Sequence, residues 1–255
     1  MGELKKLFYV IPSLLSFLYI AVFKLINYKR PRVMIYTDSR GFEITKIYNR
    51  KTPWNSYINF FVKRFRCDVY ICPEKHTTFF DFIFKLNSKR NYKHIVCHVG
   101  VVDFSPRPDS AVKEIILKKK QKIVDVFGEK TFQNFLNTPK YSSSYLGEQT
   151  ASIVHENFIK IIAEKLNKID NLIWVSCNPV LSDWNGNYKK KRPKNIGIVN
   201  DKSRGLQRLL NKKIKVIDLT NLGNHEVKKL TCDNIHLSKK GMKFLEQSLK
   251  TIMYE

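Results

Sequence analysis

The chain has 255 residues, with 46 Lys or Arg against 22 Asp or Glu, so its formal net charge is +24 at pH 7. Its 43% hydrophobic and 13% aromatic content excludes a disordered basic tail, and its length suits one compact domain with at most a small appendage. Five cysteines without a C-x-x-C pair or zinc spacing disfavour a disulfide scaffold. The charge predicts a polyanionic partner, whether nucleic acid, anionic lipid or acidic glycan.

The first distinctive segment, residues 7–23, contains no charged side chain and has basic residues on both sides. We expect residues 1–30 to form a membrane-associating hydrophobic helix with a basic flank, and residues 31–255 to form the main domain. The segment is near the lower length limit for crossing a bilayer, so spanning, lying in the interface and packing as a buried helix all stay open. Because most of the flanking basic residues follow the segment, the positive-inside rule places the main domain on the cytoplasmic side of the inner membrane.

From residue 33 onward, short apolar runs alternate with longer amphipathic ones. Strands that are apolar on both faces and alternate with helices are typical of a parallel sheet covered on both sides. The pattern therefore predicts a three-layer α/β/α fold with a five-stranded, mostly parallel sheet. The predicted strands are 33–37, 68–72, 94–102, 172–177 and 215–219, and the predicted helices are 54–65, 79–86, 110–126, 148–168 and 238–253.

Polar side chains follow the first and the last predicted strands. Ser39 comes after the first, and Asp233 and His236 precede the closing helix. In such sheets ligands bind beyond the carboxyl ends of the strands, so these side chains are expected at one edge. A serine becomes a nucleophile when a histidine removes its proton and a carboxylate orients the imidazole, which suggests a Ser39–His236–Asp233 triad. The plainer alternative is that these residues cap helices and form a turn.

These blocks resemble those of the SGNH (GDSL-like) hydrolases. Thr37-Asp38-Ser39 is similar to the Gly-Asp-Ser motif of that family, and the block that begins at Asp233 and contains His236 is similar to its Asp-x-x-His motif. The run from His98 to Arg107 resembles SGNH-like proteins of bacterial surface-polysaccharide clusters. The likeness covers residues 33–253. It implies an SGNH-hydrolase or flavodoxin-like fold and a serine esterase or O-acetyltransferase acting on a capsule or lipopolysaccharide glycan. The resemblance implies that no cofactor is needed. If the enzyme transfers an acetyl group to a glycan, acetyl-CoA is the expected acyl donor.

The chain departs from that family at three places. Thr37 replaces the first Gly, residues 73–77 contain no Gly to match the second motif, and Val102 replaces the Asn that completes the oxyanion hole. Valine cannot donate a hydrogen bond, so either another group such as Asn178 substitutes or catalysis is weakened. The alternative function is a binding module for anionic glycan or membrane lipid. The candidate oxyanion and substrate-binding residues are Gly100, Asn178, Asp103 and Arg107.

Two of these candidates have alternative roles. Asn178 precedes Pro179, and a turn residue is the plainer interpretation of that position. Asp103 and Arg107 are interpreted either as an ion pair that organises the loop or, for Arg107, as a contact to an anionic substrate group. No histidine shows metal-ligand spacing, so no metal site is predicted.

Basic residues are concentrated between positions 183 and 215, where eleven Lys or Arg stand against two Asp. Such a stretch beside an active site favours an anionic sugar ester as substrate, although a solvated surface would have the same composition. Nucleic acid is disfavoured as a partner because no helix-turn-helix, zinc-finger or RNP-type motif is present.

Overall fold

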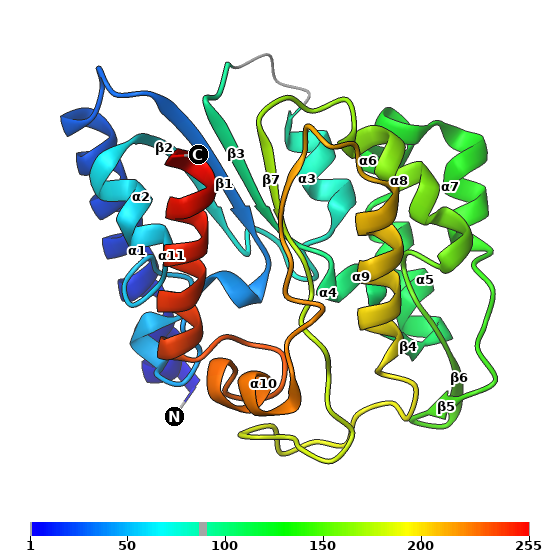
Figure 1. Ribbon diagram of the computed structural model, residues 1–255. Coiled ribbons are helices and arrows are strands. Elements are labelled where there is room, and N and C mark those ends of the chain that lie inside the picture. Colours follow the sequence, from blue (N-terminus) through cyan, green and yellow to red (C-terminus); the bar gives the residue numbers. More distant parts are fainter. Residues whose placement is uncertain (1, 87–90, 255) are drawn as a thin grey trace.

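The computed structural model describes residues 2–86 and 91–254, with the side chains of the first helix described from residue 11 onward. Five parallel strands form the central sheet in the order β2-β1-β3-β7-β8 (Figure 1). The connection to β2 leads to one side of β1 and the connection to β3 to the other, which creates a topological switch point between β1 and β3. The predicted three-layer α/β fold is confirmed. The strands are β1 (Arg32–Thr37), β2 (Arg66–Ile71), β3 (His94–His98), β7 (Leu172–Val175) and β8 (Lys215–Ile217).

The apolar runs become strands because both faces of the sheet are covered. Along β1, Val33 and Ile35 face one hydrophobic core, and Met34 and Tyr36 face the other. A strand buried on both faces lacks the polar alternation of a half-exposed strand, which explains its continuous apolar sequence.

Helices form the two outer layers (Figure 1). One face of the sheet packs against α1, α2 and α11, whose apolar side chains share a core with Val33 and Ile35. The opposite face packs against the remaining helices except α10, which follows β8. The helices are α1 (Gly2–Ile26), α2 (Ile58–Arg64), α3 (Phe79–Leu86), α4 (Val101–Phe104), α5 (Asp109–Lys118), α6 (Lys120–Phe127), α7 (Glu129–Leu136), α8 (Ile159–Leu166), α9 (Ile198–Leu209), α10 (Asn224–Leu230) and α11 (Lys239–Tyr254).

A small antiparallel sheet lies beside the main one, in the order β4-β6-β5. Its strands are β4 (Arg107–Pro108), β5 (Ser144–Tyr145) and β6 (Glu148–Ala151). The helix predicted over 148–168 was therefore wrong at its start, because residues 148–151 pair with β4 and β5 and α8 begins only at Ile159.

Other predicted boundaries were also wrong. The third strand ends at His98 instead of residue 102, because Gly100 takes a φ of 132° and turns the chain into α4. The helix predicted over 110–126 is divided at Lys119, whose ammonium group points inward to Asp81. The helix predicted over 54–65 begins only at Ile58, and the helices α4, α7, α9 and α10 were not predicted.

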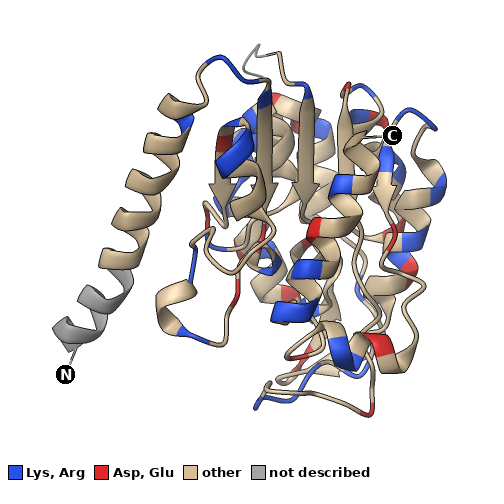
Figure 2. Cartoon of the chain, turned by 60° about the vertical axis from the view of Figure 1, so that its left-hand side comes forward, with Lys and Arg blue, Asp and Glu red and all other residues tan. Residues whose placement is uncertain are grey.

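Helix α1 packs along the domain with one side only (Figure 2). Tyr19 Oη donates to Asn59 Oδ1 at 2.7 Å, Asn27 Nδ2 donates to the Val62 carbonyl at 3.0 Å, and Lys24 pairs with Asp68 on β2. Its other side is apolar and exposed. The exposed side chains are Ile11, Leu14, Leu15, Phe17, Leu18, Val22, Leu25 and Ile26.

The side chains of residues 7–10, part of the predicted segment 7–23, lie outside the described residues. Over the part of the chain that is described, no helix combines the length and the apolar character needed to cross a membrane.

Candidate active site

All strands of the main sheet end at the same edge, where the arrowheads of Figure 2 point together. Ser39 reaches this edge because β1 ends at Thr37 and a short 3-10 helix begins at Ser39. Thr37 stands where the resembled family has glycine, and the space it needs comes from Gly41. A Cβ at Gly41 would lie 2.1 Å from Thr37 Oγ1, so only glycine fits there.

The structure brings Ser39, His236 and Asp233 together. His236 Nε2 lies 2.8 Å from Ser39 Oγ, and His236 Nδ1 lies 2.8 Å from Asp233 Oδ2. Asp233 Oδ1 also accepts hydrogen bonds from the backbone N–H groups of Ile235 and His236. Burial raises the pKa of Asp233, but its hydrogen bonds and attraction to His236 outweigh burial and hold that pKa below its usual value. The ionised carboxylate is therefore placed to orient the imidazole.

The turn that carries Asp233 and His236 is braced by Asn234, which the sequence analysis did not single out. Asn234 has a φ of 72°, a left-handed conformation that asparagine tolerates better than most residues. Its buried side chain accepts from the Leu181 N–H at 2.9 Å and donates to the carbonyls of Leu181 and Trp184. The Asp-Asn-Ile-His sequence carries a signal for such a turn, because Asn is typical of left-handed turn positions.

Asn178 does not substitute for the missing oxyanion donor. Its Nδ2 donates to the carbonyls of Pro179 and Asn234, at 2.8 and 3.1 Å. Both bonds hold the 233–236 turn against the segment that follows β7, so Asn178 is a structural neighbour of the triad.

A fully buried ion pair supports Ser39 from behind. Arg40 is 0% exposed, and its Nε and Nη2 each lie 3.1 Å from an oxygen of the Asp38 carboxylate. Its Nη1 donates to the Ser176 carbonyl beyond the end of β7, at 3.1 Å. The Asp38–Arg40 pair thus ties the loop after β1 to the end of β7. Nothing in the local sequence shows that the guanidinium group of Arg40 turns inward, so its role could not be predicted.

The segment after β3 contributes one wall of the site. Gly100 forms the sharp turn, and Val102 faces the same cavity as Ser39. Asp103 turns away from it, because its Oδ1 accepts the Phe79 N–H at 3.0 Å. Burial raises the pKa of Asp103 to about 8, with the nearby Asp81 carboxylate adding to the effect. No ion pair joins Asp103 to Arg107 among the described residues, so the proposed loop pair was wrong.

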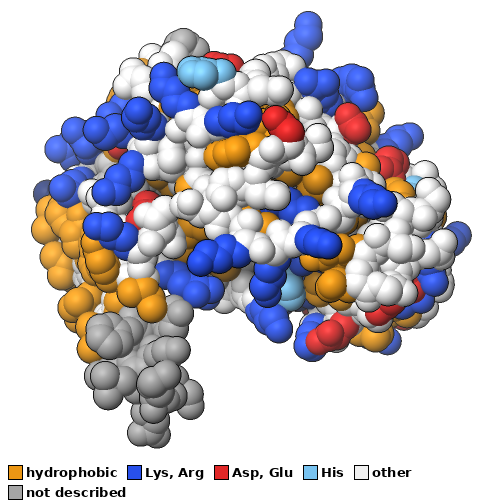
Figure 3. Space-filling view, turned by 90° about the horizontal axis from the view of Figure 1, so that it is seen from below, with side chains coloured by type: hydrophobic (Ala, Val, Ile, Leu, Met, Phe, Trp, Pro, Cys, Tyr) orange, Lys and Arg blue, Asp and Glu red, His pale blue; other side chains and the backbone are white. Residues whose placement is uncertain are grey.

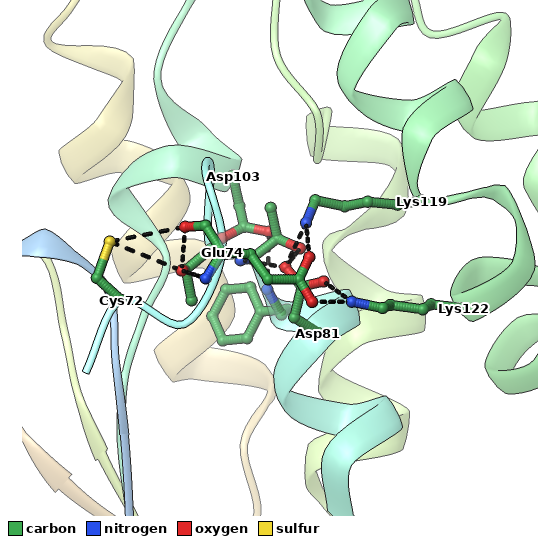
Figure 4. A network of polar contacts seen from close by, with 9 residues as sticks. Cys72, Glu74, Asp81, Asp103, Lys119 and Lys122 are labelled. Atoms are coloured by element: carbon green, nitrogen blue, oxygen red, sulfur yellow. Dashed lines mark hydrogen bonds and ion pairs between the residues drawn. The ribbon is translucent and has the colours of Figure 1, made fainter. Parts of the chain in front are cut away.

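The loop that would hold the second oxyanion glycine is instead part of a charged network (Figure 4). Lys119 Nζ lies 2.6 Å from Asp81 Oδ2 and 3.1 Å from Glu74 Oε2, and Lys122 pairs with the same two carboxylates. Thr77 Oγ1 donates to the Glu74 carbonyl at 3.0 Å. These bonds hold residues 74–81 against α6, and we assign this network a structural role.

A cavity of about 410 Å³ opens beside Ser39 and His236. Val101, Val102 and Ile235 form apolar parts of its wall. Arg107, Arg192, Tyr145 and Tyr188 complete it on the side of the small sheet and the basic stretch 183–215. Figure 3 shows this edge of the molecule, over which basic side chains are spread and acidic ones are sparse. We call this cavity the Ser39 cavity.

Within the described ranges, no group of three or more His, Cys, Asp or Glu side chains is arranged to hold a metal ion.

Comparisons with known proteins show distant structural similarity only. No family model and no curated protein matches the chain. The structure is similar to the crystal structure of the acetyl xylan esterase AlAXEase, with a TM-score of 0.45 and 16% identity over 87% of this chain and 98% of that one. A second solved structure gives a TM-score of 0.44 and 14% identity over 88% of this chain and 95% of that one.

Proposed function

We propose that the chain is a serine-dependent acyl-transfer enzyme, an esterase or O-acetyltransferase, with Ser39 as nucleophile, His236 as base and Asp233 as its orienting carboxylate. The observation that carries this proposal is the relay of two 2.8 Å contacts, from Asp233 through His236 to Ser39, beside an open cavity. Three residues drawn from opposite ends of the chain meet in the geometry that serine nucleophiles require.

In this reaction Ser39 Oγ attacks the ester carbonyl and its proton passes to His236 Nε2. The protonated imidazole, stabilised by Asp233, then gives that proton to the leaving alkoxide as the tetrahedral intermediate collapses to an acyl-serine. Water or a sugar hydroxyl next attacks the acyl group and gives its proton to His236, which passes that proton to Ser39 Oγ as the acyl–oxygen bond breaks. Hydrolysis and transfer differ only in this second nucleophile.

The oxyanion would be stabilised by fewer donors than in the family that the sequence resembles. The Ser39 N–H has no hydrogen-bond acceptor among the described residues, so it is free to donate to the intermediate. Val102 cannot donate from its side chain. Since one lost oxyanion donor typically costs about 10²–10³ in rate, we expect slow turnover. The second candidate function, which Val102 favours, is a binding module for anionic glycan or membrane lipid that has lost catalysis.

We take the substrate to be a carbohydrate ester, as the sequence resemblance implies, in the assembly of a bacterial capsule or lipopolysaccharide glycan. No cofactor takes part in the steps above, and acetyl-CoA would serve as donor in the transfer direction. The two tyrosines of the Ser39 cavity, Tyr145 and Tyr188, offer aromatic surface of the kind that packs against sugar rings.

We further propose that α1 lies on an anionic membrane surface at the cytoplasmic side of the inner membrane. Its outward side exposes Phe17 and Leu25 at 68% and 73%, and the exposed basic residues Lys29 and Arg30 follow its end. An apolar face beside cations fits a lipid interface with anionic headgroups. Co-sedimentation with phosphatidylglycerol vesicles should be strong for the wild type and weak for Phe17→Ser/Leu25→Ser. Equal sedimentation of both proteins would contradict the proposal.

The triad is tested by turnover of p-nitrophenyl acetate and by labelling with a fluorophosphonate probe. We expect Ser39→Ala to abolish labelling, and both Ser39→Ala and His236→Ala to reduce turnover to background. Ser182→Ala, which removes an exposed serine near the same edge, is the matched control and should match the wild type. Unchanged turnover in both triad variants would overturn the enzymatic proposal, and absence of labelling in the wild type would favour the binding module.

A further inference from the structure

Two arginines on the wall of the Ser39 cavity have N–H groups that find no hydrogen-bond acceptor among the described residues. Arg107 belongs to β4, and Arg192 belongs to the basic stretch 183–215, yet both line the cavity together with Ser39 and His236. Tyr145 and Tyr188 line the same cavity. The fold therefore gathers two guanidinium groups from distant segments at one place.

These guanidinium groups are poorly satisfied by the protein. Neither Arg107 nor Arg192 forms an ion pair within the described part of the chain, and the Nε atom of each is buried without a hydrogen-bond partner there. Arg192 makes one side-chain bond, from Nη2 to the Asp233 carbonyl at 2.5 Å, and its guanidinium stacks 3.9 Å from the centre of the Tyr188 ring. Burial lowers the pKa of both arginines, and the attraction of Arg107 to Asp103 and of Arg192 to Asp233, which raises it, does not offset the loss of water.

The cavity offers an anion no competing carboxylate. None of the described residues that line it is Asp or Glu, and much of the remaining wall is apolar, including Val101, Val102 and Ile196. Apolar walls keep water from screening the arginines, so their attraction for a negative group is stronger than at an open surface.

We propose that Arg107 and Arg192 bind an anionic group, a carboxylate or a phosphate, carried by the same sugar ester whose acyl group is placed at Ser39. The inference rests on the proposed function and names its substrate class: acylated uronic acids or sugar phosphates rather than neutral sugars. A guanidinium matches either anion with two parallel hydrogen bonds, so two arginines can fix the orientation of the sugar.

The position of Arg192 also links this anion site to the triad. Its Nη2 holds the backbone carbonyl of Asp233, the residue that orients His236. A bound anion that orders Arg192 would therefore also steady the turn between Asp233 and His236. Because Arg192 acts on the turn as well, Arg107 is the cleaner residue for testing the anion site alone.

The first experiment compares acetate release from two matched esters, 4-acetoxybenzoate and its neutral methyl ester. For the wild type we expect a higher kcat/KM with the anion. Arg107→Gln should lower the ratio of anionic to neutral kcat/KM about ten- to a hundredfold, mainly through KM, as befits hydrogen bonds to a charged group. Arg107→Lys should restore part of the ratio. Lys194→Gln, an exposed neighbour of Arg192, is the charge-matched control and should leave the ratio unchanged.

Two outcomes of this comparison would overturn the proposal. One is a wild type without preference for the anionic ester. The other is an equal loss on both esters in Arg107→Gln, which would make Arg107 an oxyanion donor for all substrates. Acetylated glucuronate and acetylated glucose 6-phosphate, assayed beside acetylated glucose, then distinguish carboxylate from phosphate as the preferred group.

A binding measurement separates failure of the anion site from failure of the triad. With Ser39→Ala, which cannot form an acyl-serine, glucuronate and glucose 6-phosphate should perturb the NMR signals of the Arg107 and Arg192 side chains, while glucose should not. Perturbation together with an inactive wild type would support the anion site and reject the enzymatic proposal. Turnover in the wild type without any perturbation by either anion would reject the anion site and leave the triad standing.

Discussion

The buried basic side chains behind Ser39 form ion pairs, whereas the arginines that line the cavity in front of it form none within the described ranges. Behind it, Arg40 is enclosed and bonded to Asp38, and farther along Lys119 is enclosed and bonded to Asp81. In front of it, Arg107 and Arg192 belong to a cavity whose described lining contains no Asp or Glu, and neither forms an ion pair within the described ranges. A buried charge without a counter-charge is costly, so proteins keep one mainly where a ligand completes it. We therefore assign Arg40 and Lys119 a structural role, and we propose that Arg107 and Arg192 bind the substrate.

The most direct test of this difference replaces one paired arginine, Arg40, and one unpaired arginine, Arg107, and compares the stability of the two variants. Arg40→Met leaves the Asp38 carboxylate buried and unpaired, so the free energy of unfolding should fall by about 3–5 kcal/mol. Arg107→Met removes an unpaired charge and keeps an apolar stem, so it should change stability by less than about 1 kcal/mol. Urea unfolding followed by circular dichroism measures both. Similar losses in the two variants would mean that Arg107 is as structural as Arg40.

A second test lies within the charged network of Figure 4. Lys119→Met should cost about 1.5–3 kcal/mol, because it removes a nearly buried ammonium from Asp81. Lys122→Met should cost less, because the side chain of Lys122 is 26% exposed against 5% for Lys119 and water screens its charge. The same unfolding experiment measures both substitutions. A larger loss for Lys122→Met would contradict the ranking by burial.

Asp103 gives a test by pH, because its folded pKa is raised to about 8. Between the unfolded pKa near 4 and about pH 8, the folded state holds a proton that the unfolded state has released, so stability falls as pH rises. Asp103→Asn abolishes this titration and its Oδ1 can still accept the Phe79 N–H. The variant should therefore gain stability relative to the wild type by up to roughly 1.4 kcal/mol per pH unit across this window. A difference that stays constant from pH 5 to pH 8 would show that Asp103 does not titrate there.

The smallest expected effect is that of salt on the anion site. Raising the salt from about 0.1 M to about 1 M shortens the Debye length from about 10 Å to about 3 Å, which weakens attraction between charges that water can reach. The kcat/KM for 4-acetoxybenzoate should fall a few-fold, while that for its methyl ester stays unchanged. Equal salt dependence of the two esters would point to a general effect on the enzyme instead of Arg107 and Arg192.

Much of the fold could be predicted from local patterns. The strands at 33–37 and 172–177 were recognised because both of their faces are buried, and that burial leaves a continuous apolar run. The errors fall where a distant partner decides the local structure. Residues 148–151 form β6 because they pair with β4 and β5. The chain turns at Gly100 and ends β3, although the valines on both sides of this glycine suggested that the strand continued.

The candidate site shows the same division. Ser39 was predicted because it follows a strand of the sheet, and Asp233 and His236 were predicted because they stand three residues apart just before the last helix. The contacts of Arg192 and of the Asn234 side chain were not predicted, because they join one loop to another and no spacing in the sequence marks them. The sequence left two roles open for Asn178, because the direction of its amide depends on a carbonyl that the fold brings in from residue 234.

By itself, the sequence determined the parallel sheet and the edge at which its polar residues gather, because periodic burial leaves a record in the order of apolar and polar residues. Only the tertiary structure decided which of the many positive charges have partners. Arg40 and Arg107 are the same residue type, and each belongs to the segment that follows a strand of the main sheet, Arg40 after β1 and Arg107 in β4 after β3 and α4. Whether a guanidinium meets a carboxylate or an open cavity depends on distances across the fold, which composition and spacing do not contain.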